Sequence, residues 1–285
     1  MPRDCQDGAA RGDLGAMRIL KLETAPLFSW PHLSAAPRGG VETQDLPLLR
    51  GTVDALPAGL DALVVTSDLQ GVAPCAALGG AVALLGEVLA DGLAALSAEG
   101  VLPPLAHTGV VLAGDLFSDD AALVRGASGD VRPVWEAFGQ QFRWVVGVAG
   151  NHDTFGTARE QARFFRQRPA LRLLDGDVVD VDGLRVGGVG GIIGRPDRPG
   201  RRDEAAFLQG LRSVMRQGPE VLVLHQGPDA PGPHLRGSAA IRECLPARED
   251  LLVICGHSHW DTPLASLPAG PQVLNVDSRA VLLTR

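Results

Sequence analysis

The chain has no tyrosine and a single lysine, Lys21, among its 26 basic residues. Arginine therefore supplies nearly all of the positive charge. With the abundant alanine, glycine and proline, this bias is typical of a GC-rich coding sequence and favours a bacterial source. The 33 acidic residues exceed the basic ones and leave a net charge of −7 over 285 residues. This excess argues against binding of nucleic acid through overall positive charge, so we do not expect nucleic acid as a partner.

Cysteine is scarce, and the spacing of the cysteines does not match a disulfide framework. The four cysteines form no CxxC motif and lie at Cys5, Cys75, Cys244 and Cys255. Disulfides persist mainly in oxidising compartments. We therefore expect reduced, mostly buried thiols in a cytoplasmic protein.

Long apolar segments are missing from the sequence as well. Residues 1–16 carry acidic groups and lack an apolar core, which argues against a secretory signal peptide and indicates a disordered tail. The longest run without charge, residues 69–86, contains a proline and four glycines. We interpret this run as a loop that enters a helix, and we expect no association with a membrane.

Short runs rich in valine, isoleucine and leucine recur along the chain. They lie at residues 62–66, 109–113, 144–149, 221–224 and 251–255. Runs that are apolar at successive positions predict strands buried on both faces. Helical patterns separate several of them, namely an apolar stripe from Leu78 to Leu96 and the segments 131–142 and 203–216. The alternation predicts an α/β fold.

A second group of strands is predicted in the C-terminal half. Residues 171–174, 178–181 and 184–189 are separated by Asp175-Gly176 and Asp182-Gly183, which are strong hairpin signals. Residues 263–284 repeat short apolar runs and indicate further antiparallel strands. We therefore predict two stacked mixed β-sheets flanked by helices, in a single domain over residues 17–285. Residues 22–58 show little periodicity, and we interpret them either as an ordered insert that caps the site or as a loose lead-in.

The residues that follow the predicted strands are the most informative. Each apolar run ends in groups that can bind a metal or act in catalysis: Asp68 and Gln70, Asp115, Asn151 and His152, His225, and His257 and His259. Ligands of open α/β sheets bind beyond the carboxyl ends of the strands, so we expect these side chains to meet in one pocket. Carboxylate, amide and imidazole donors suit Mn²⁺, Fe or Zn²⁺ rather than Ca²⁺.

The number of donors predicts two metal ions. Six residues supply ligands, with Gln70 as a candidate seventh: Asp68, Asp115, Asn151, His225, His257 and His259. One ion with open positions needs only about three or four protein ligands. A carboxylate such as Asp115 can bridge two ions about 3.5–4 Å apart, a spacing that suits phosphoryl transfer. Such ions also acidify water, which provides a nucleophile without a serine or cysteine.

The motifs D-x-Q, GD, GNHD, H and GHSH occur in this order within residues 61–285 and resemble those of the calcineurin-like metallophosphoesterase superfamily. The resemblance implies two stacked mixed sheets flanked by helices. It also implies a hydrolase that cleaves a phosphomonoester or phosphodiester with a metal-bound hydroxide at a dinuclear site. By position, the resemblance assigns Asp68 and His259 to the first ion, Asn151, His225 and His257 to the second, and Asp115 to both.

The resemblance implies catalytic roles as well. His152 would protonate the leaving oxygen or hold the transferring phosphoryl group, and Asn151 would also contact the substrate. Asp115 would be essential to catalysis because it serves both ions. The substrate would be a small phosphorylated molecule, for example a nucleotide.

The sequence departs from the family pattern at two positions. Gln70 stands where the family has a histidine, and an amide oxygen is a harder and weaker ligand than imidazole. We therefore expect a first site that is less occupied, is filled differently, or prefers Mn²⁺ or Mg²⁺. Mn²⁺ is our first choice for both ions, with Fe, Zn²⁺ or Mg²⁺ as alternatives. Ser118 stands where the second motif has a later aspartate, and Asp119 follows it directly.

Arginines in a Gly/Pro-rich loop are candidates for the substrate side of the site. Arg195 and Arg198 lie in the loop 190–202, which follows a predicted strand. Arginine binds phosphate in a bidentate manner, and glycines allow the backbone to approach an anion closely. The alternative is a solvated loop in which these arginines pair with acidic neighbours such as Asp197.

Two other functions are compatible with the same motifs. One is a catalytically weakened scaffold that binds a protein partner, an interpretation supported only by Gln70. The other is a nuclease of the same fold, which the acidic net charge and the lack of a basic stripe disfavour. Activity towards chromogenic mono- and diesters separates the enzyme from the scaffold.

Overall fold

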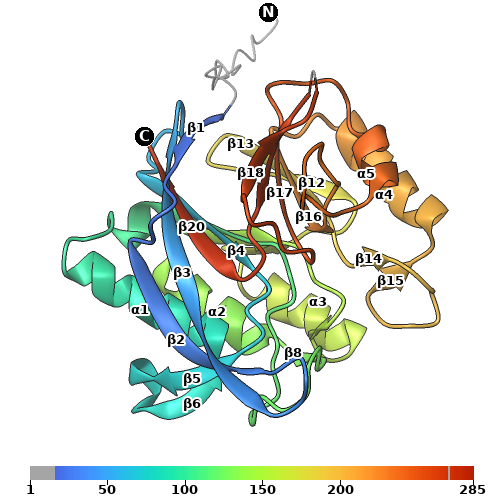
Figure 1. Cartoon of the computed structure of the whole chain (residues 1–285). Helices are drawn as coiled ribbons and strands as arrows, with labels where there is room; N and C mark the ends of the chain where they lie inside the picture. Colours follow the sequence, from blue (N-terminus) through green and yellow to red (C-terminus); the bar gives the residue numbers. More distant parts are fainter. Residues whose placement is uncertain (1–16, 269) are drawn as a thin grey trace, which may run out of the picture.

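Two β-sheets stack face to face, and helices cover the outer face of each (Figure 1). We analysed a computed structural model that describes residues 17–268 and 270–285. The predicted tail, residues 1–16, lies outside the described residues. The arrangement confirms the predicted fold class, two stacked mixed sheets flanked by helices.

The larger sheet has ten strands. Its order is β11 (Leu171–Leu173), β9 (Trp144–Gly147), β7 (Thr108–Leu112), β4 (Ala62–Ser67), β20 (Arg279–Thr284), β3 (Val41–Val53), β2 (Phe28–Ala35), β5 (Val72–Cys75) and β6 (Ala81–Leu84), and β1 (Ile19–Leu22) also pairs with β3. Strands β11, β9, β7 and β4 run parallel, whereas β20 is antiparallel to β4. The carboxyl ends of β4, β7 and β9 therefore lie at the same edge of the sheet.

The smaller sheet has six strands in the order β12 (Asp177–Val181), β13 (Leu184–Val189), β16 (Val221–Gln226), β17 (Leu252–Gly256), β19 (Gln272–Asn275) and β18 (Leu264–Ser266). Its four central strands are parallel, and its two edge strands are antiparallel to their neighbours. Two short ribbons pair β8 (Gly129–Asp130) with β10 (Asp153–Thr154) and β14 (Ile192–Ile193) with β15 (Arg201–Arg202).

Helices α1 (Leu85–Ala98), α2 (Arg132–Gln141) and α3 (Ala158–Arg166) pack on the larger sheet, and α4 (Glu204–Arg216) and α5 (Ala239–Cys244) on the smaller one. Short 3₁₀ turns occupy Ala76–Leu78 and Leu105–His107. The side chains of Trp135 and Phe138 in α2 and of Phe207 in α4 are fully buried. None of the helices that the structure describes is both long and apolar enough to cross a bilayer.

The main core lies between the two sheets. Val65 and Val111 of the larger sheet join Val223 and Ile254 of the smaller one in a single buried cluster. The alternate residues of the same strands, such as Val110, face the helices instead. Because successive side chains of a strand point to opposite faces, both sets must be apolar, which explains the continuous apolar runs in the sequence.

One hairpin prediction is confirmed and one is wrong. Asp182 and Gly183 both have positive φ and connect β12 to β13, as a type I′ turn requires. Asp175-Gly176 instead joins β11 of the larger sheet to β12 of the smaller one. The dipeptide determines only the local turn. The strand before the dipeptide, β11, pairs in parallel with β9 of the larger sheet. Strands β11 and β12 therefore belong to different sheets.

The helix predicted from the apolar stripe starts earlier in the sequence than the helix in the structure. Residues 72–84 form the β5–β6 hairpin, which turns at Gly79 and Gly80 with positive φ, and α1 begins only at Leu85. Leu78 and Val82 are exposed, although they continue the apolar spacing of α1. The paired glycines favour a turn and interrupt the helix, so the spacing alone was misleading.

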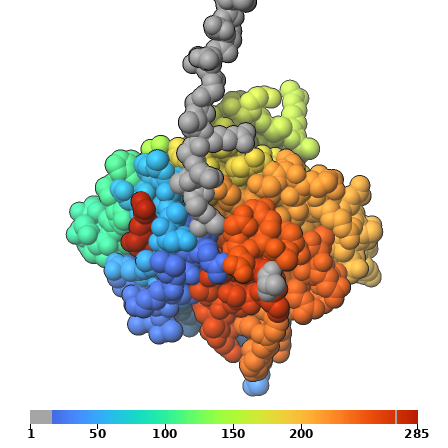
Figure 2. Space-filling view, turned by 90° about the horizontal axis from the view of Figure 1, so that it is seen from above, coloured from blue at the N-terminus to red at the C-terminus, as the bar shows by residue number. Residues whose placement is uncertain are grey.

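The N-terminal segment 22–58 is ordered and contributes strands to the larger sheet. Strands β2 and β3 form a long hairpin, and β3 pairs in parallel with β20. Just before this segment, in β1, the main chain of Ile19 exchanges two hydrogen bonds of 2.9 and 3.0 Å with the Gln272 side chain of β19. Figure 2 shows the N-terminal strands, in blue, directly beside the C-terminal part of the chain, in orange and red. The first strand therefore links the two sheets.

We predict that Ile254→Ala lowers the free energy of unfolding by about 2–5 kcal/mol, because it leaves a cavity between the sheets. Ile254 is fully buried. Urea denaturation measures the change. The control Leu123→Ala removes an exposed side chain, and we expect a change within about 0.5 kcal/mol. Equal losses in the two variants would contradict the assignment of the intersheet core.

Candidate metal centre

The carboxyl ends of five strands from both sheets meet at one edge of the molecule. Asp68 follows β4, Asp115 follows β7 and Asn151 follows β9, while His225 ends β16 and His257 follows β17. The Nδ1 atom of His225 lies 2.8 Å from the Ala113 carbonyl oxygen and thereby connects the sheets. A carbonyl oxygen only accepts, so Nδ1 carries the hydrogen and Nε2 faces the site.

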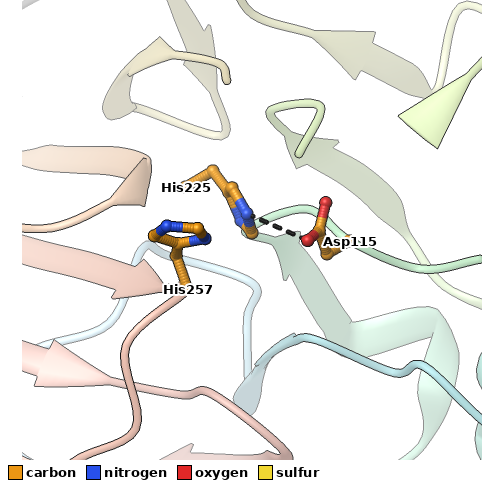
Figure 3. Close-up of side chains that lie close together, drawn as sticks. All are labelled: Asp115, His225 and His257. Carbon is orange, nitrogen blue, oxygen red and sulfur yellow. Dashed lines mark ion pairs between the residues drawn. The ribbon is translucent and has the colours of Figure 1, made fainter. Parts of the chain in front are cut away.

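Asp115, His225 and His257 form a compact cluster (Figure 3). Their ligand atoms all lie within 4.8 Å of one another. His225 Nε2 is 3.3 Å from Asp115 Oδ2, and the two imidazole rings have centroids 5.1 Å apart. Three residues from three separate strands thus converge as the sequence predicts.

The backbone at this edge is held in an unusual conformation. Asp68, Asp115 and His257 have φ angles of 53°, 55° and 66°, in the left-handed region that favours glycine. Each such residue costs on the order of 1–3 kcal/mol and persists only where the surroundings enforce it. The strain turns the side chains that end these strands towards a common point.

Glycines at two of the motifs make room for the carboxylates. A Cβ atom on Gly150 would overlap the carboxylate of Asp115, and one on Gly256 would overlap Ser67 Oγ and Asp68 Oδ2. Only glycine fits at these two positions, which explains the G of GNHD and of GHSH.

Asp153 fixes the loops that carry Asp115 and Asn151. Its carboxylate accepts hydrogen bonds from the main-chain N–H groups of Asp115 at 2.8 Å, Leu116 at 2.7 Å and Gly150 at 2.7 Å. Burial, followed by the charge of Asp115, raises the pKa of Asp153 to about 6. This residue acts through the backbone and does not offer itself as a ligand.

The neighbouring charges set the protonation of the cluster, and an ion that binds His225 would displace a proton. Burial lowers the pKa of His257 to about 4, with a further contribution from His225, so His257 is neutral at pH 7 and its lone pair is available. Burial alone would lower the pKa of His225, but the Asp115 carboxylate outweighs it and holds that pKa near 10. The same pairing outweighs burial at Asp115 and lowers its pKa to about 2.

Two buried polar atoms support the fit of a metal ion. Asn151 Oδ1 and His225 Nε2 have no hydrogen-bond partner among the described residues. The 3.3 Å approach of His225 to Asp115 is an ion-pair distance without hydrogen-bond geometry. Unpaired buried polar atoms are costly, and a divalent ion would satisfy both. An amide oxygen, two imidazole nitrogens and a carboxylate form a donor set suited to Mn²⁺, Fe or Zn²⁺.

The remaining predicted ligands are placed differently. Asp68 Oδ2 accepts hydrogen bonds from Ser67 Oγ at 2.6 Å and from the His257 main chain at 2.9 Å. Gln70 donates through Nε2 to Asp115 Oδ2 at 3.2 Å. His259 is exposed and lies 3.2 Å from the Asp277 carboxylate. The structure thus brings Asp68 and Gln70 to the edge of the cluster but draws His259 away from it.

His152 lies beside the cluster on the loop after β9. Its main-chain N–H donates to Asp115 Oδ1 at 2.9 Å, and its ring Nδ1 lies 3.0 Å from Ser128 Oγ. The first contact fixes the main chain and the second orients the ring, so Nε2 is the nitrogen left for a substrate.

The predicted substrate arginines lie elsewhere. Arg195 is exposed and 3.8 Å from Asp197, and neither Arg195 nor Arg198 lines the cavities at Asp68 and at His259. Their loop contacts the strand end that carries Asn151 through Gly191, whose N–H donates to the Ala149 carbonyl at 2.8 Å, and through Gly200, which packs against the backbone of Asn151.

A polar cavity of about 190 Å³ opens beside Asp68 and Gln70. Residues that the sequence analysis did not assign also line it, including the β2 residue His32, the β3 residue Asp45, and Arg125. His32 lies in a segment without periodicity, and Arg125 lies in an irregular loop, so no local pattern indicated either. Asp119 shapes that loop by accepting hydrogen bonds from the main-chain N–H groups of Leu123 and Val124.

Comparison with known proteins gives one family and a common fold. A model of the calcineurin-like phosphoesterase family matches residues 62–261. No curated protein matches the sequence. One crystal structure is 13% identical, with a TM-score of 0.51 over 78% of this chain and 91% of that chain. The Thermus thermophilus sulfate thiohydrolase SoxB, in complex with glycerol, is 16% identical, with a TM-score of 0.38 over 78% of this chain and 52% of that chain.

We predict that Mn²⁺ raises the thermal unfolding temperature of the metal-free protein. Free ion at a hundred times its Kd adds about 2.7 kcal/mol. For a chain of this size, this corresponds to roughly 5–10 °C. Differential scanning calorimetry measures the shift, which should vanish in His257→Ala. The exposed His107→Ala variant is the control and should keep it. A shift that survives in His257→Ala would place the ion elsewhere.

Proposed function

The chain belongs to the calcineurin-like phosphoesterase family, and we propose that it is a metal-dependent phosphoesterase whose ion is held by Asp115, Asn151, His225 and His257. The observation that carries this proposal is the convergence of Asp115, His225 and His257 within 4.8 Å, with His225 Nε2 buried and without a hydrogen-bond partner. A dinuclear centre would also require Asp68, Gln70 and His259. We therefore propose first a single metal site, formed by the four residues named above.

A divalent ion at this position would supply Lewis-acid polarisation of the phosphoryl group and acidification of water at neutral pH. The chain supplies orientation. His225 donates from Nδ1 to the Ala113 carbonyl, which directs the Nε2 lone pair into the site. Asp115 contributes a negative charge at the centre, and Asp153 holds the backbone on either side of that charge.

We assign proton transfer to His152. Its main chain is fixed on Asp115 and its ring on Ser128, so Nε2 can give a proton to the leaving oxygen of a phosphate ester. The ring is partly exposed, which leaves it in reach of a substrate in the cleft. Asn151 contributes its amide oxygen to the ion, and its amide nitrogen remains available to a phosphoryl oxygen.

The polar cavity gives the substrate side of the proposal. It has room for a small phosphorylated group, and the β2–β3 hairpin forms one wall, which supports a capping role for residues 22–58. Arg125 is the only arginine or lysine among its lining residues. We therefore propose Arg125, rather than Arg195 or Arg198, as the arginine that binds the phosphate.

A catalytically weakened scaffold is the second candidate, favoured by the displacement of His259 and by the amide at Gln70. The intact Asp115–His225–His257 cluster and the ordered His152 support the enzyme instead. A nuclease would need to hold a polyanion, and the acidic Glu42 and Asp45 in the cavity wall oppose this. An oligonucleotide included in the assay tests this third function.

We predict that His152→Ala lowers kcat for p-nitrophenyl phosphate or its bis-ester by about 10²–10⁴ in the presence of Mn²⁺, because the general acid is lost. Bound metal, measured by elemental analysis, should stay unchanged. Asp115→Asn should abolish activity and lose the metal together. Wild-type protein that binds Mn²⁺ but hydrolyses neither ester would support the scaffold.

We predict that Arg125→Ala raises KM for the monoester by about 10–100-fold, as expected for loss of one charge-assisted hydrogen bond. Arg195→Ala and Arg198→Ala are matched controls, because they remove the same charge from the exposed loop. Steady-state kinetics compares the three variants. A larger KM effect in either control than in Arg125→Ala would restore the role predicted from the sequence.

A further inference from the structure

We propose that the centre holds one divalent ion, because the groups that would hold a second are engaged by the protein itself. The inference rests on the proposed function, since it concerns the same site. The second ion would need His259, Asp68, Gln70 and a share of Asp115. Each of these four has partners that compete with a cation.

His259 faces a positive charge where a ligand would face the ion. A terminal guanidinium nitrogen of Arg279 lies 3.0 Å from His259 Nε2 and 3.2 Å from Nδ1. Guanidinium is always charged and can only donate. The positive charge of Arg279 therefore lies against the His259 ring, and the Asp277 carboxylate lies 3.2 Å from Nδ1 of the same ring.

Arg279 cannot easily leave this position. It is only 5% exposed and begins β20, where it pairs with Ser67 of β4. The nitrogen that contacts His259 also donates to the Trp260 carbonyl at 2.8 Å, and the Arg279 carbonyl accepts from Thr66 Oγ1 at 2.9 Å. A divalent ion on His259 would lie next to a fixed like charge, which is unfavourable.

Both carboxylate oxygens of Asp115 already have partners within the protein. Its Oδ1 accepts from the His152 main chain at 2.9 Å. Its Oδ2 faces both His225 Nε2 and the donating amide of Gln70. An ion bound by His225 takes the Oδ2 side, and the Gln70 N–H then occupies the place of a second ion on the same carboxylate.

Asp68 alone cannot supply the missing ligands. Its Oδ2 already accepts two hydrogen bonds, which leaves Oδ1. An ion needs about three or four protein ligands. The distances also argue against a second site. The ligand atoms of Asp115, His225 and His257 lie within 4.8 Å of one another, whereas Asp68, Asp115 and His259 form no such group among the described residues.

The test is the number of ions that each chain binds. Chelator-treated wild-type protein is reloaded with Mn²⁺, desalted and measured by elemental analysis, and electron paramagnetic resonance distinguishes an isolated Mn²⁺ from an exchange-coupled pair. We expect one ion per chain with the spectrum of an isolated ion, and almost none in His257→Ala.

The double variant Gln70→His/Arg279→Met supplies the imidazole and removes the charge, so we expect it to bind a second, coupled ion. Gln70→His alone should stay at one ion, because Arg279 still faces His259. Circular dichroism checks that the variants fold. The number of ions bound per wild-type chain decides the question even if a variant does not fold. Two ions in wild type overturn this inference and leave the proposed function intact. No bound ion in wild type overturns both.

Discussion

The burial of the Asp115 carboxylate is the constraint on which the rest of the site depends. A buried anion is stable only when it is surrounded by donors or cations. The chain brings the main-chain N–H of His152, the amide of Gln70 and the ring of His225 to its two oxygens. It also bends the backbone into the left-handed region and fixes it through Asp153. Ligands from two different sheets can converge because this one charge requires partners from both.

Much of the fold could be predicted because burial on both faces of a strand leaves a strong pattern. The runs that became β4, β7, β9, β16 and β17 are apolar at every position for this reason. Pairing partners are determined by contacts distant in sequence. The same Asp-Gly signal therefore gave a hairpin at residue 182 and a connection between sheets at residue 175. The β2–β3 hairpin, a continuous part of the larger sheet, lacked a periodic signal because Pro31, Pro47 and polar residues interrupt it.

The candidate site was predictable as a set of strand ends but not as a set of contacts. Asp115, His225 and His257 lie together because parallel strands end at one edge, which follows from topology. The orientation of His259 depends on Asp277 and Arg279. These two residues come near His259 because β20 inserts beside β4. Likewise, Arg125 lines the cavity because Asp119 folds the preceding loop, whereas Arg195 and Arg198 are exposed and Arg195 lies 3.8 Å from Asp197. Side-chain partners of this kind have no local signature.

The position of β20 has a consequence for how the protein is made. The final strand of the chain lies in the interior of the larger sheet, between β4 and β3, rather than at an edge. During translation, the two halves of that sheet have no shared neighbour until β20 has emerged from the ribosome. Such long-range pairing slows folding. A nascent chain in which β20 has not yet been made would present two open strand edges, and such edges invite pairing with other chains.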